Sequence, residues 1–529
     1  MKLVYTISCY VPDPSHEEET YLTYLKTLDK HRINLMAGLS WQERVFRTNQ
    51  SQTKGFTDDF YGTNNMGVGT LPEKPGSEYQ KWSMNSYFLR AAYTYNDKYM
   101  TTLTGRIDGS SRFGENNKYA FFPSAGLGWL MSNEDFMKDI NAISNLKLHT
   151  SYGITGNSEI PVYQSLAMMG SGTTLINGSL VPTAWPDRLA NPDLKWEKTY
   201  TFDVGVELGL FRNRLNFDVS YYNKKTKDLL LARPVPYHTG YSSVMSNMGE
   251  VTNQGVDILI SSTNVETSDF TWGTTLNMNY NKNKINALGE NNEDIFPDPS
   301  WVSGPQTILR VGESLSSFWG YERLGIWTEE DKAAGRIPSG QIVGQAKRSA
   351  EKKVLGKGIP DITGSFINNF RYKNFDMTVD MQFVLGVDVL QQFTHSLEDR
   401  FGLTNGEKAI LHDAWSPSNP NTIVQAIRNG ARDGQSSELD SRWVADGSYL
   451  RANLIQLGYT FNPKMIKPLS LSSLRVYFGV NNAFLIKSSD FRGYDPEATS
   501  QGDNQWGQNM FFFQYPKPRT FTFGVSATF

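Results

Sequence analysis

The connections between the predicted strands alternate between short and long. Read backward from residue 529, the short connections are 462–473, 373–374, 264–270 and 211–213, and the long ones are 483–517, 386–449, 282–361, 225–254 and 157–199. Successive connections of an antiparallel sheet fall at opposite ends, so this alternation gathers all the long loops at one end. The two ends of a soluble sandwich are chemically alike, whereas a bacterial outer-membrane barrel has short periplasmic turns and long external loops. The pattern therefore favours such a barrel.

The last residues of the chain show what kind of strand these connections join. Alternate positions are apolar (Phe521, Phe523, Val525, Ala527 and Phe529) or polar and uncharged (Thr520, Thr522, Gly524, Ser526 and Thr528). Side chains of a strand point alternately to its two faces, so one face is apolar and the other polar. Such a strand suits a wall between lipid and a watery lumen, although alone it also fits the edge strand of a soluble sandwich.

About fourteen to sixteen strands are predicted, most of nine to eleven residues, the length that crosses a bilayer when tilted. The clearest hairpins join 20–28 to 33–41, 85–95 to 99–109, 200–210 to 214–224, 255–263 to 271–281, 362–372 to 375–385 and 450–461 to 474–482. Single strands are expected at 121–131, 146–156 and 520–529, with a further candidate at 2–10. The expected fold is an all-β, antiparallel transmembrane β-barrel with long external loops, either closed or incomplete and open.

Composition excludes several other classes of protein. The 529 residues carry a formal charge of −3 with scattered Lys and Arg, which gives no basic surface for nucleic acid. No window approaches eighteen apolar residues, and the mean hydropathy of −0.45 is compatible with alternating barrel strands. The single cysteine, Cys9, allows no disulfide framework. The start of the sequence has no recognisable export signal.

Short motifs recur in a fixed order along most of the chain. They are 106–114 (RIDGSSRFG), 126–129 (GLGW), 146–157 (LKLHTSYGITGN), 191–197 (NPDLKWE), 247–255 (NMGEVTNQG), 312–321 (GESLSSFWGY), 449–451 (YLR), 457–460 (LGYT) and 493–497 (GYDPE), followed by the closing Phe529. Each motif alone is weakly specific. Their order and spacing closely resemble those of SusC/RagA-type TonB-dependent outer-membrane transporters.

The resemblance implies a 22-stranded barrel around a plug, of which residues 1–529 form a partial barrel domain without the plug. It also implies an outer-membrane location in a bacterium of Bacteroidota type. The implied partners are a SusD-like surface lipoprotein, the TonB complex, outer-membrane lipid, an oligosaccharide or peptide ligand, and the barrel-assembly machinery, which would read Phe529. The implied function is nutrient import. A passive pore or structural barrel fragment is the alternative.

Aromatic residues in the predicted external loops are the candidate ligand-binding residues: Trp301, Trp319, Tyr321, Trp327, Tyr494 and Trp506. Flat rings stack on sugars, but the same rings can instead pack the loops together. For Trp129, Trp196 and Trp272, which lie in or next to predicted strands, we expect a position at the membrane interface. Asp203, Glu207, Arg451 and Asn453 are expected on lumen-facing positions.

No enzyme motif was found, so no catalysis, cofactor or metal is expected. The six histidines lack metal-ligand spacing, and the acidic residues Glu293, Asp294 and Asp298 lack the spacing of a calcium-binding loop. A hydrolase remains a third hypothesis, and it would need His149, a histidine within a confident strand, together with a neighbouring Ser or Asp.

Overall fold

The computed structural model describes residues 3–10, 16–58, 60, 62–241, 243–297, 304–399, 405–427, 438–497, 500 and 506–529. By its internal contacts the chain divides into two compact units. Unit 1 comprises Met1–Trp129, Thr150–Phe202 and Thr226–Met248, and unit 2 comprises Leu130–His149, Asp203–Lys225 and Gly249–Phe529. Strands β8 (Ile143–Asn157), β11 (Glu197–Leu210) and β12 (Leu215–Lys227) have residues in both, as does β7 (Tyr119–Leu130) through its last residue, Leu130.

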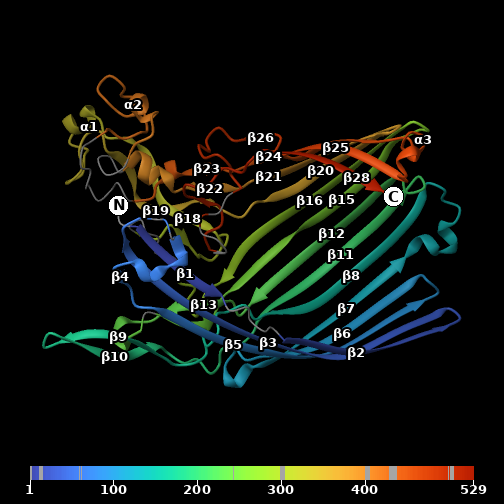
Figure 1. Cartoon of the computed structure of the whole chain (residues 1–529), viewed down its shortest axis with the longest axis horizontal. Helices are drawn as coiled ribbons and strands as arrows, with labels where there is room; N and C mark the ends of the chain where they lie inside the picture. Colours follow the sequence, from blue (N-terminus) through green and yellow to red (C-terminus); the bar gives the residue numbers. More distant parts are fainter. Residues whose placement is uncertain are drawn as a thin grey trace. The chain divides into compact units, whose positions relative to one another are not determined.

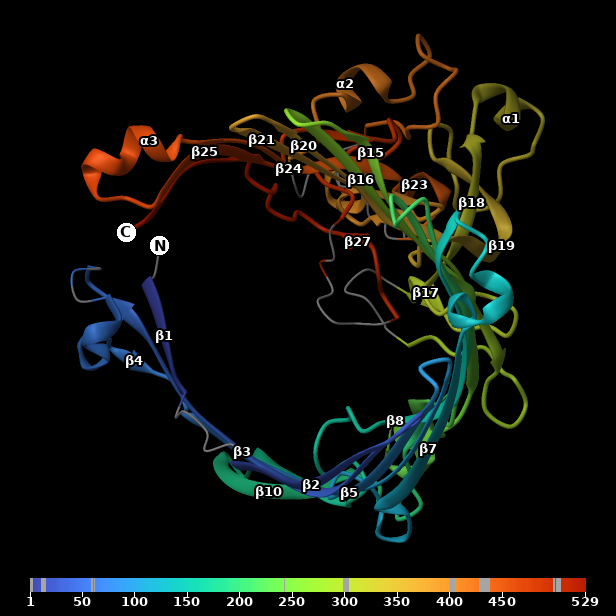
Figure 2. The same cartoon turned by 90° about the vertical axis from the view of Figure 1, so that its right-hand side faces the viewer.

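Unit 1 is an antiparallel meander built on one very long strand. Its strands are β1 (Leu3–Tyr10), β2 (His16–Leu28), β3 (His31–Phe56), β4 (Leu71–Pro72), β5 (Gly76–Tyr95), β6 (Tyr99–Ser110) and β7 (Tyr119–Leu130), with the hairpins β9 (Met168–Ile176) to β10 (Ser179–Arg188) and β13 (Leu230–Pro234) to β14 (Ser243–Asn247). Both β1 and β2 pair with one edge of β3, and β5 pairs with its other edge (Figure 2). Strand β3 extends far beyond the predicted 33–41.

Unit 2 contains a second meander with large insertions. Its wall strands are β15 (Glu250–Glu266), β16 (Phe270–Ala287), β20 (Ile362–Tyr372), β21 (Phe375–Leu385), β24 (Tyr449–Thr460), β25 (Ser473–Asn481), β26 (Leu485–Lys487) and β28 (Thr520–Thr528) (Figure 1). The bounds of β20 and β21 coincide with those predicted. Eighteen strands of the described chain take part in the meander pairing, slightly more than expected, because the short β4 and β26 are included.

The long connections of unit 2 have secondary structure of their own. Strands β17 (Thr307–Ile308), β18 (Ser317–Ile326) and β19 (Ala346–Lys357) form one small sheet, and β22 (Asp388–Gln391), β23 (Val444–Asp446) and β27 (Met510–Phe511) form another. The α-helices of the described residues are α1 (Glu329–Ala333), α2 (Ile410–Asp413) and α3 (Pro463–Ile466). The long connections leave β16, β21 and β25 at the same end, and the short turns lie at the other, as the sequence predicted.

The strand register separates an apolar face from a polar face in each unit. On β6 of unit 1, Leu103 and Ile107 point outward and are about half exposed, whereas Thr104 and Arg106 lie on the opposite face. In unit 2 the terminal strand pairs with β25 so that Phe523 lies opposite Phe478, and both rings are largely exposed. The alternation predicted for the last strand is therefore confirmed, and it continues across the neighbouring strands.

Aromatic rings gather where the apolar face meets the short turns. In unit 1 the ring of Tyr99 lies 6.4 Å from that of Tyr95 and 6.3 Å from that of Trp129. In unit 2 Trp272 stacks on Phe370 at 5.8 Å. Such rows of rings are typical of the membrane interfaces of barrels, and they fit the role predicted for Trp129 and Trp272.

The prediction for Trp196 is wrong. Only 4% of this residue is exposed, because its ring packs against Phe113 at 4.8 Å and Phe122 at 5.3 Å. Its indole N–H donates to the carbonyl of Lys118 at 2.9 Å, so the polar edge of the ring is satisfied inside the protein. Together with Ile160 and Leu194 these rings form a buried core that supports the long connections of unit 1.

Glycines make room for side chains on both faces. A Cβ atom at Gly109 would lie 2.2 Å from the ring of outward-facing Tyr119. A Cβ atom at Gly458 would lie 2.5 Å from the guanidinium of Arg475, which pairs with Asp376 on the polar face. Gly458 thus makes room for a neighbour on the polar face, and Gly109 for one on the apolar face.

Candidate functional site

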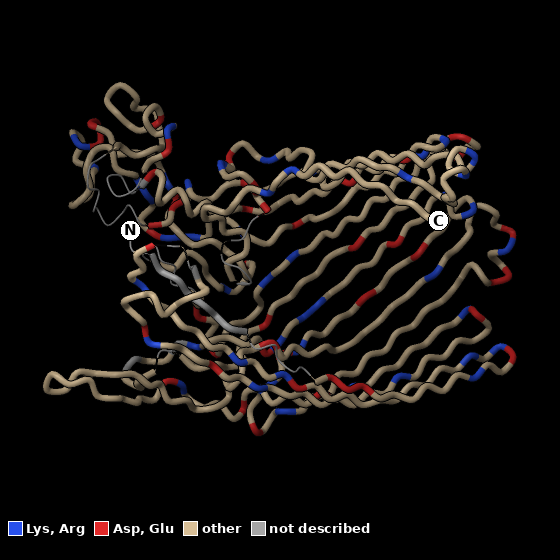
Figure 3. The backbone as a smooth tube through the Cα atoms, in the orientation of Figure 1, with Lys and Arg blue, Asp and Glu red and all other residues tan. Residues whose placement is uncertain are grey.

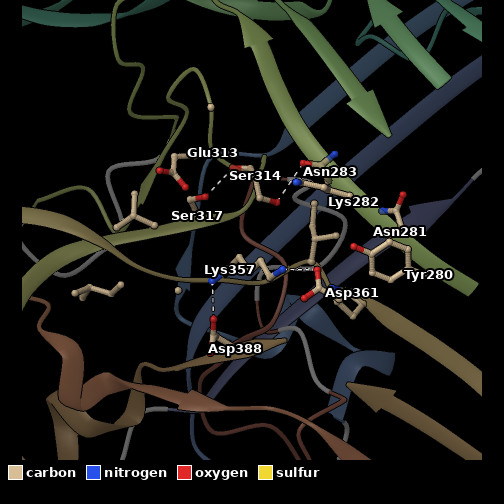
Figure 4. Close-up of a pocket in the computed structure, with 16 residues that line it drawn as sticks. Tyr280, Asn281, Lys282, Asn283, Glu313, Ser314, Ser317, Lys357, Asp361 and Asp388 are labelled. Carbon is tan, nitrogen blue, oxygen red and sulfur yellow. Dashed lines mark hydrogen bonds and ion pairs between the residues drawn. The ribbon is translucent and has the colours of Figure 1, made fainter. Parts of the chain in front are cut away.

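The polar face of unit 2 ends in a cavity of about 620 Å³, which we call the asparagine cavity. Its wall is made by residues 280–283 of β16, by 312–314 and Ser317, by 354–357 of β19, by 359–361, and by Asp388 at the start of β22 (Figure 4). A volume of this size lies within the range of about 300–1,000 Å³ that is usual for ligand sites. The cavity lies at the end of the strands where the long connections begin.

The cavity exists because β16 is longer than its neighbour. Strand β20 begins at Ile362 opposite Tyr280, so the residues of β16 that follow pair with no wall strand of the described chain on that side. Asn281 N–H still donates to the carbonyl of Asp361 at 2.8 Å, and Ile285 N–H donates to that of Glu313 at 2.8 Å. Alternation along a strand directs the main-chain groups of Asn283 to the same edge, between these two bonds. This edge can therefore offer a peptide N–H and C=O to a ligand.

Two asparagine side chains form the polar floor. The side-chain oxygen of Asn283 accepts from Leu315 N at 2.8 Å and from the hydroxyl of Ser314 at 3.1 Å, and its amide nitrogen donates to Asn253 at 2.8 Å. The side-chain oxygen of Asn281 accepts from the hydroxyl of Tyr222 at 3.0 Å. These bonds fix the amides before any ligand arrives, which lowers the entropy cost of binding.

The negative and positive side chains that line the cavity are nearly equal in number, with one more acid than base. The acids are Glu313, Asp361 and Asp388, and the bases are Lys282 and Lys357. The ammonium of Lys357 contacts Asp361, and its main-chain N–H donates to Asp388 at 2.9 Å. Burial raises the pKa of Asp388 above its usual value, although the bond from Lys357 opposes this. The ring of Tyr280 is 43% exposed, but alternation along β16 directs it to the face opposite Asn281. The amides and the nearly balanced charges are therefore the groups that suit a polar, uncharged ligand.

The loop aromatics predicted from the sequence lie elsewhere in unit 2. Trp319 and Tyr321 are partly buried on β18, where Arg310 covers Trp319 at 4.5 Å and Lys352 covers Tyr321 at 5.1 Å. Trp327 is only 7% exposed, with Lys347 at 4.7 Å from its ring. These contacts show how the three rings pack within the loops.

The remaining aromatic candidates are scattered. Tyr494 is 72% exposed, Trp506 is partly buried, and Trp301 lies outside the described residues. None of the described members of this set lines the asparagine cavity. A ligand-binding role for these six aromatics, and an assembly role for Phe529, stay predictions.

Two of the expected lumen residues, Glu207 and Arg451, are held in ion pairs. Lys147 binds Glu207 at 2.6 Å, and Arg451 binds Asp495 at 2.5 Å. Only 3% of Arg451 is exposed, so this residue anchors the connection that contains Asp495.

The surroundings of His149 bear on the hydrolase hypothesis. Its Nε2 lies 3.4 Å from the hydroxyl of Ser220 and 3.5 Å from Asp203, while its Nδ1 lies 3.9 Å from Glu207. A nucleophile triad needs the hydroxyl on one ring nitrogen and the carboxylate on the other, each at about 2.6–3.2 Å. Here the nearer carboxylate and the hydroxyl share one nitrogen, which does not favour catalysis.

A buried ion cluster ties the long connections of unit 2 together. Asp440, which is fully buried, accepts from Arg323 at 2.6 Å and from Arg348 at 2.8 Å. Burial raises the pKa of Asp440, but the two guanidiniums outweigh this and leave the pKa below its usual value. Arg442 donates to Glu398 at 2.6 Å nearby. Acidic and basic residues lie next to each other in the connections that carry α1 and α2 (Figure 3).

No group of three or more acidic, histidine or cysteine side chains that could hold a metal occurs among the described residues. Asp294, which was considered for calcium, forms an ion pair with Arg310 at 2.6 Å, and Asp298 lies outside the described residues. No helix of the described chain is long and apolar enough to cross a membrane.

Comparison with known proteins places these features in a family. The family described as "TonB dependent receptor-like, beta-barrel" matches residues 12–483. The chain belongs to this family. Its members are transporters and receptors of the bacterial outer membrane, and the predicted resemblance to the SusC/RagA type and the antiparallel barrel-type fold are confirmed.

Individual relatives agree with this assignment. TonB-dependent receptor P3 of Formosa agariphila is 36% identical over 530 residues, which cover 97% of this chain and 52% of the relative. TonB-dependent receptor SusC of Bacteroides thetaiotaomicron is 29% identical, covering 96% of this chain and 49% of the relative. The RagAB peptide transporter matches with a TM-score of 0.81 at 26% identity, covering 99% of this chain and 56% of that one. The chain thus spans about half the length of these relatives.

Sequence reasoning missed the asparagine cavity. Asn281 and Asn283 stand in a run of alternating Asn and Lys residues that is ordinary for a polar strand face. The signal that could have indicated the cavity is the difference in length between strands: the polar alternation of β16 continues past residue 281, the predicted end, whereas β20 begins after Pro360.

Proposed function

We propose that this chain forms wall and external loops of an outer-membrane importer of SusC type, which binds oligosaccharides or peptides and passes them inward without covalent chemistry. In this proposal a SusD-like lipoprotein covers the external end, and the TonB complex supplies energy. The observation that carries the proposal is the asparagine cavity, with its fixed amides and an open strand edge, at the external end of the polar face.

The cavity chemistry suits ligands with many hydroxyl or amide groups. Amide side chains and a free strand edge can both donate and accept hydrogen bonds, as sugars and peptides require. The structurally similar RagAB complex is described as a peptide transporter, which supports peptides as one of the two proposed ligand classes.

The test is uptake in the native bacterium. We expect an in-frame deletion of the gene to abolish growth on one class of oligosaccharides or peptides, and the intact gene to restore it. Uptake of a fluorescent oligomer of that class should stop when a protonophore collapses the proton gradient, because TonB-coupled import needs energy.

The alternative function, a passive pore, predicts a different result. Uptake would then continue with the protonophore present, and the purified protein would give steady current across a planar bilayer. Unchanged growth of the deletion strain on every oligomer tested would contradict both transport functions and leave a structural role.

A further inference from the structure

Unit 1 contains a second cavity, of about 530 Å³, which we call the arginine cavity. It is lined by Arg44 and Phe46 of β3, by Gln80 and Trp82 of β5, and by Arg112 and residues 159–162 of two connections. None of these residues belongs to the asparagine cavity. Two arginines and an indole ring in one cavity indicate a ligand different from that of the asparagine cavity.

The floor of the arginine cavity belongs to the polar face of unit 1. Register places Arg44 directly opposite Trp82, so both side chains point to the same side of the sheet. On β5 this side also carries Ser86, whose hydroxyl accepts from Arg106 at 2.8 Å. Arg44 lies beyond Trp41 on β3, toward the long connection that leaves this strand. The cavity therefore occupies the long-connection end of the polar face.

Arg112 is held rigidly in the wall. Its guanidinium carbon lies 4.6 Å from the centre of the Trp82 ring, and its side chain is only 11% exposed. One terminal nitrogen donates to the carbonyl of Ser158 at 3.0 Å and to Glu159 at 3.2 Å. The Nε atom is buried and makes no hydrogen bond with any described residue. A cation fixed by stacking, with unused donor capacity, is suited to binding an anion.

The charge of the cavity is positive. Arg44 is exposed and has no ion pair with any described residue, and Glu159 is the one acidic residue among the lining residues. The neighbouring pair of Lys81 and Glu43, at 2.9 Å, points to the opposite side of the sheet and leaves the cavity charge unchanged.

The Glu159 carboxylate can leave while its backbone stays in place. Its side chain is 80% exposed, and exposed ion pairs contribute little to stability. The next residue, Ile160, is 5% exposed and packs in the core with Phe113 and Leu194. The hydroxyl of Tyr163 accepts from Lys81 N at 2.9 Å and fixes the same connection to β5.

We propose that the arginine cavity binds a carboxylate group of an anionic ligand between Arg44 and Arg112, and that Glu159 occupies Arg112 until the ligand displaces it. Acidic sugars and acidic peptides both carry such a carboxylate, and the test below distinguishes them. This inference rests on the proposed function and adds that some of the imported ligands carry a negative charge. Binding of such ligands can be measured even if the protein does not transport them.

The test is calorimetric binding to the purified full chain in detergent micelles, with two matched pairs of probes. Trigalacturonate is compared with its methyl ester, and a triglutamate peptide is compared with triglutamine, so that each pair differs in charge and little in shape. We expect at least one carboxylate probe to bind about tenfold more tightly than its neutral match, as for a hydrogen bond between charged groups. The probe that shows the preference identifies the source of the carboxylate.

Variants separate charge from structure. R44Q and R112Q should each abolish most of the preference, R112K should keep part of it, and E159Q should strengthen carboxylate binding about two- to threefold because the internal competitor loses its charge. R90Q is the matched control, since Arg90 lies on the same face of β5 outside the cavity. Equal binding of charged and neutral probes by the unmodified protein, or a preference that survives in both R44Q and R112Q, would overturn the proposal.

Discussion

The two units have similar apolar faces and differ at the long-connection ends of their polar faces. Both carry exposed Leu, Phe and Tyr side chains on one side of the sheet, with rows of aromatic rings near the short turns. At the long-connection end, unit 1 has the arginine cavity with a positive lining, and unit 2 has the asparagine cavity with a slight acidic excess. Lipid imposes the same chemistry on every outward position, whereas the long-connection ends of the polar faces can vary with the ligand.

Because the outward faces of the two units are chemically alike, a charged residue placed on either should have the largest effect on stability. Leu103→Arg in unit 1 and Leu457→Arg in unit 2 each place a charge at an outward position that is now about half exposed. Each should destabilise the folded protein by about 2–4 kcal/mol in a bilayer, measured by urea unfolding from liposomes. Thr104→Arg and Gln456→Arg, on the polar face beside them, are the controls and should cost little. A tolerated Leu457→Arg beside a damaging Leu103→Arg would show that the two outer faces differ.

The asparagine cavity should depend on one amide. Asn283→Leu removes the acceptor for Leu315 N and for the Ser314 hydroxyl, leaving buried groups unpaired at a cost of about 1–3 kcal/mol. We expect binding of a neutral oligomer to weaken about tenfold or more, measured by calorimetry. Asn277→Leu, on the same strand and face but outside the cavity, should leave binding unchanged. Unchanged binding in Asn283→Leu would place the ligand elsewhere.

The arginine cavity should depend on its indole ring. Trp82→Ala removes the surface on which Arg112 stacks, a contact of about 0.5–2 kcal/mol, and should reduce the carboxylate preference several-fold. Binding of neutral oligomers by the asparagine cavity should not change, which is the sharpest test that the two cavities act separately. Trp41→Ala, on the opposite side of β3, serves as the control. A parallel loss of both binding activities would contradict the separation.

The smallest effect concerns Asp388. Because burial raises its pKa in the folded protein, ionisation of this carboxyl costs stability as the pH rises above the usual Asp value of about 3.9. Asp388→Asn keeps an acceptor for Lys357 N–H and should be slightly more stable than the original at pH 7. The gain should disappear as the pH falls to 4, measured by thermal unfolding in detergent. A gain that is independent of pH would assign the effect to packing.

The alternation of apolar and polar residues predicted the barrel strands well, because strands that face lipid on one side require this alternation. Strands β20 and β21 begin and end where alternation begins and ends, and Phe521 and Phe523 lie on the predicted face. Strand β3 was underestimated because main-chain pairing continues past Trp41, where the apolar signal stops. Hydrogen bonding of the backbone does not require an apolar face, so the end of a pattern need not be the end of a strand.

The sites were harder to predict because they depend on contacts between distant segments. Trp196 has the sequence context of an interface anchor, and only the distant residues Phe113 and Phe122 make it a core residue. Arg112 lies in a motif that the sequence did indicate, but its role follows from Trp82, thirty residues earlier. Such roles depend on contacts made only in the folded chain, so they cannot be predicted from the sequence around a single residue.

The Asp440 cluster has a consequence for the order of folding. Arg323 and Arg348 lie directly opposite each other in the pairing of β18 with β19, an arrangement that like charges oppose. The carboxylate that pairs with both comes from more than ninety residues later in the chain. We therefore expect the hairpin of β18 and β19 to be less stable until the segment before β24 supplies Asp440. Slower protection of this hairpin in Asp440→Asn, measured by pulsed hydrogen exchange, would support that order, and unchanged protection would contradict it.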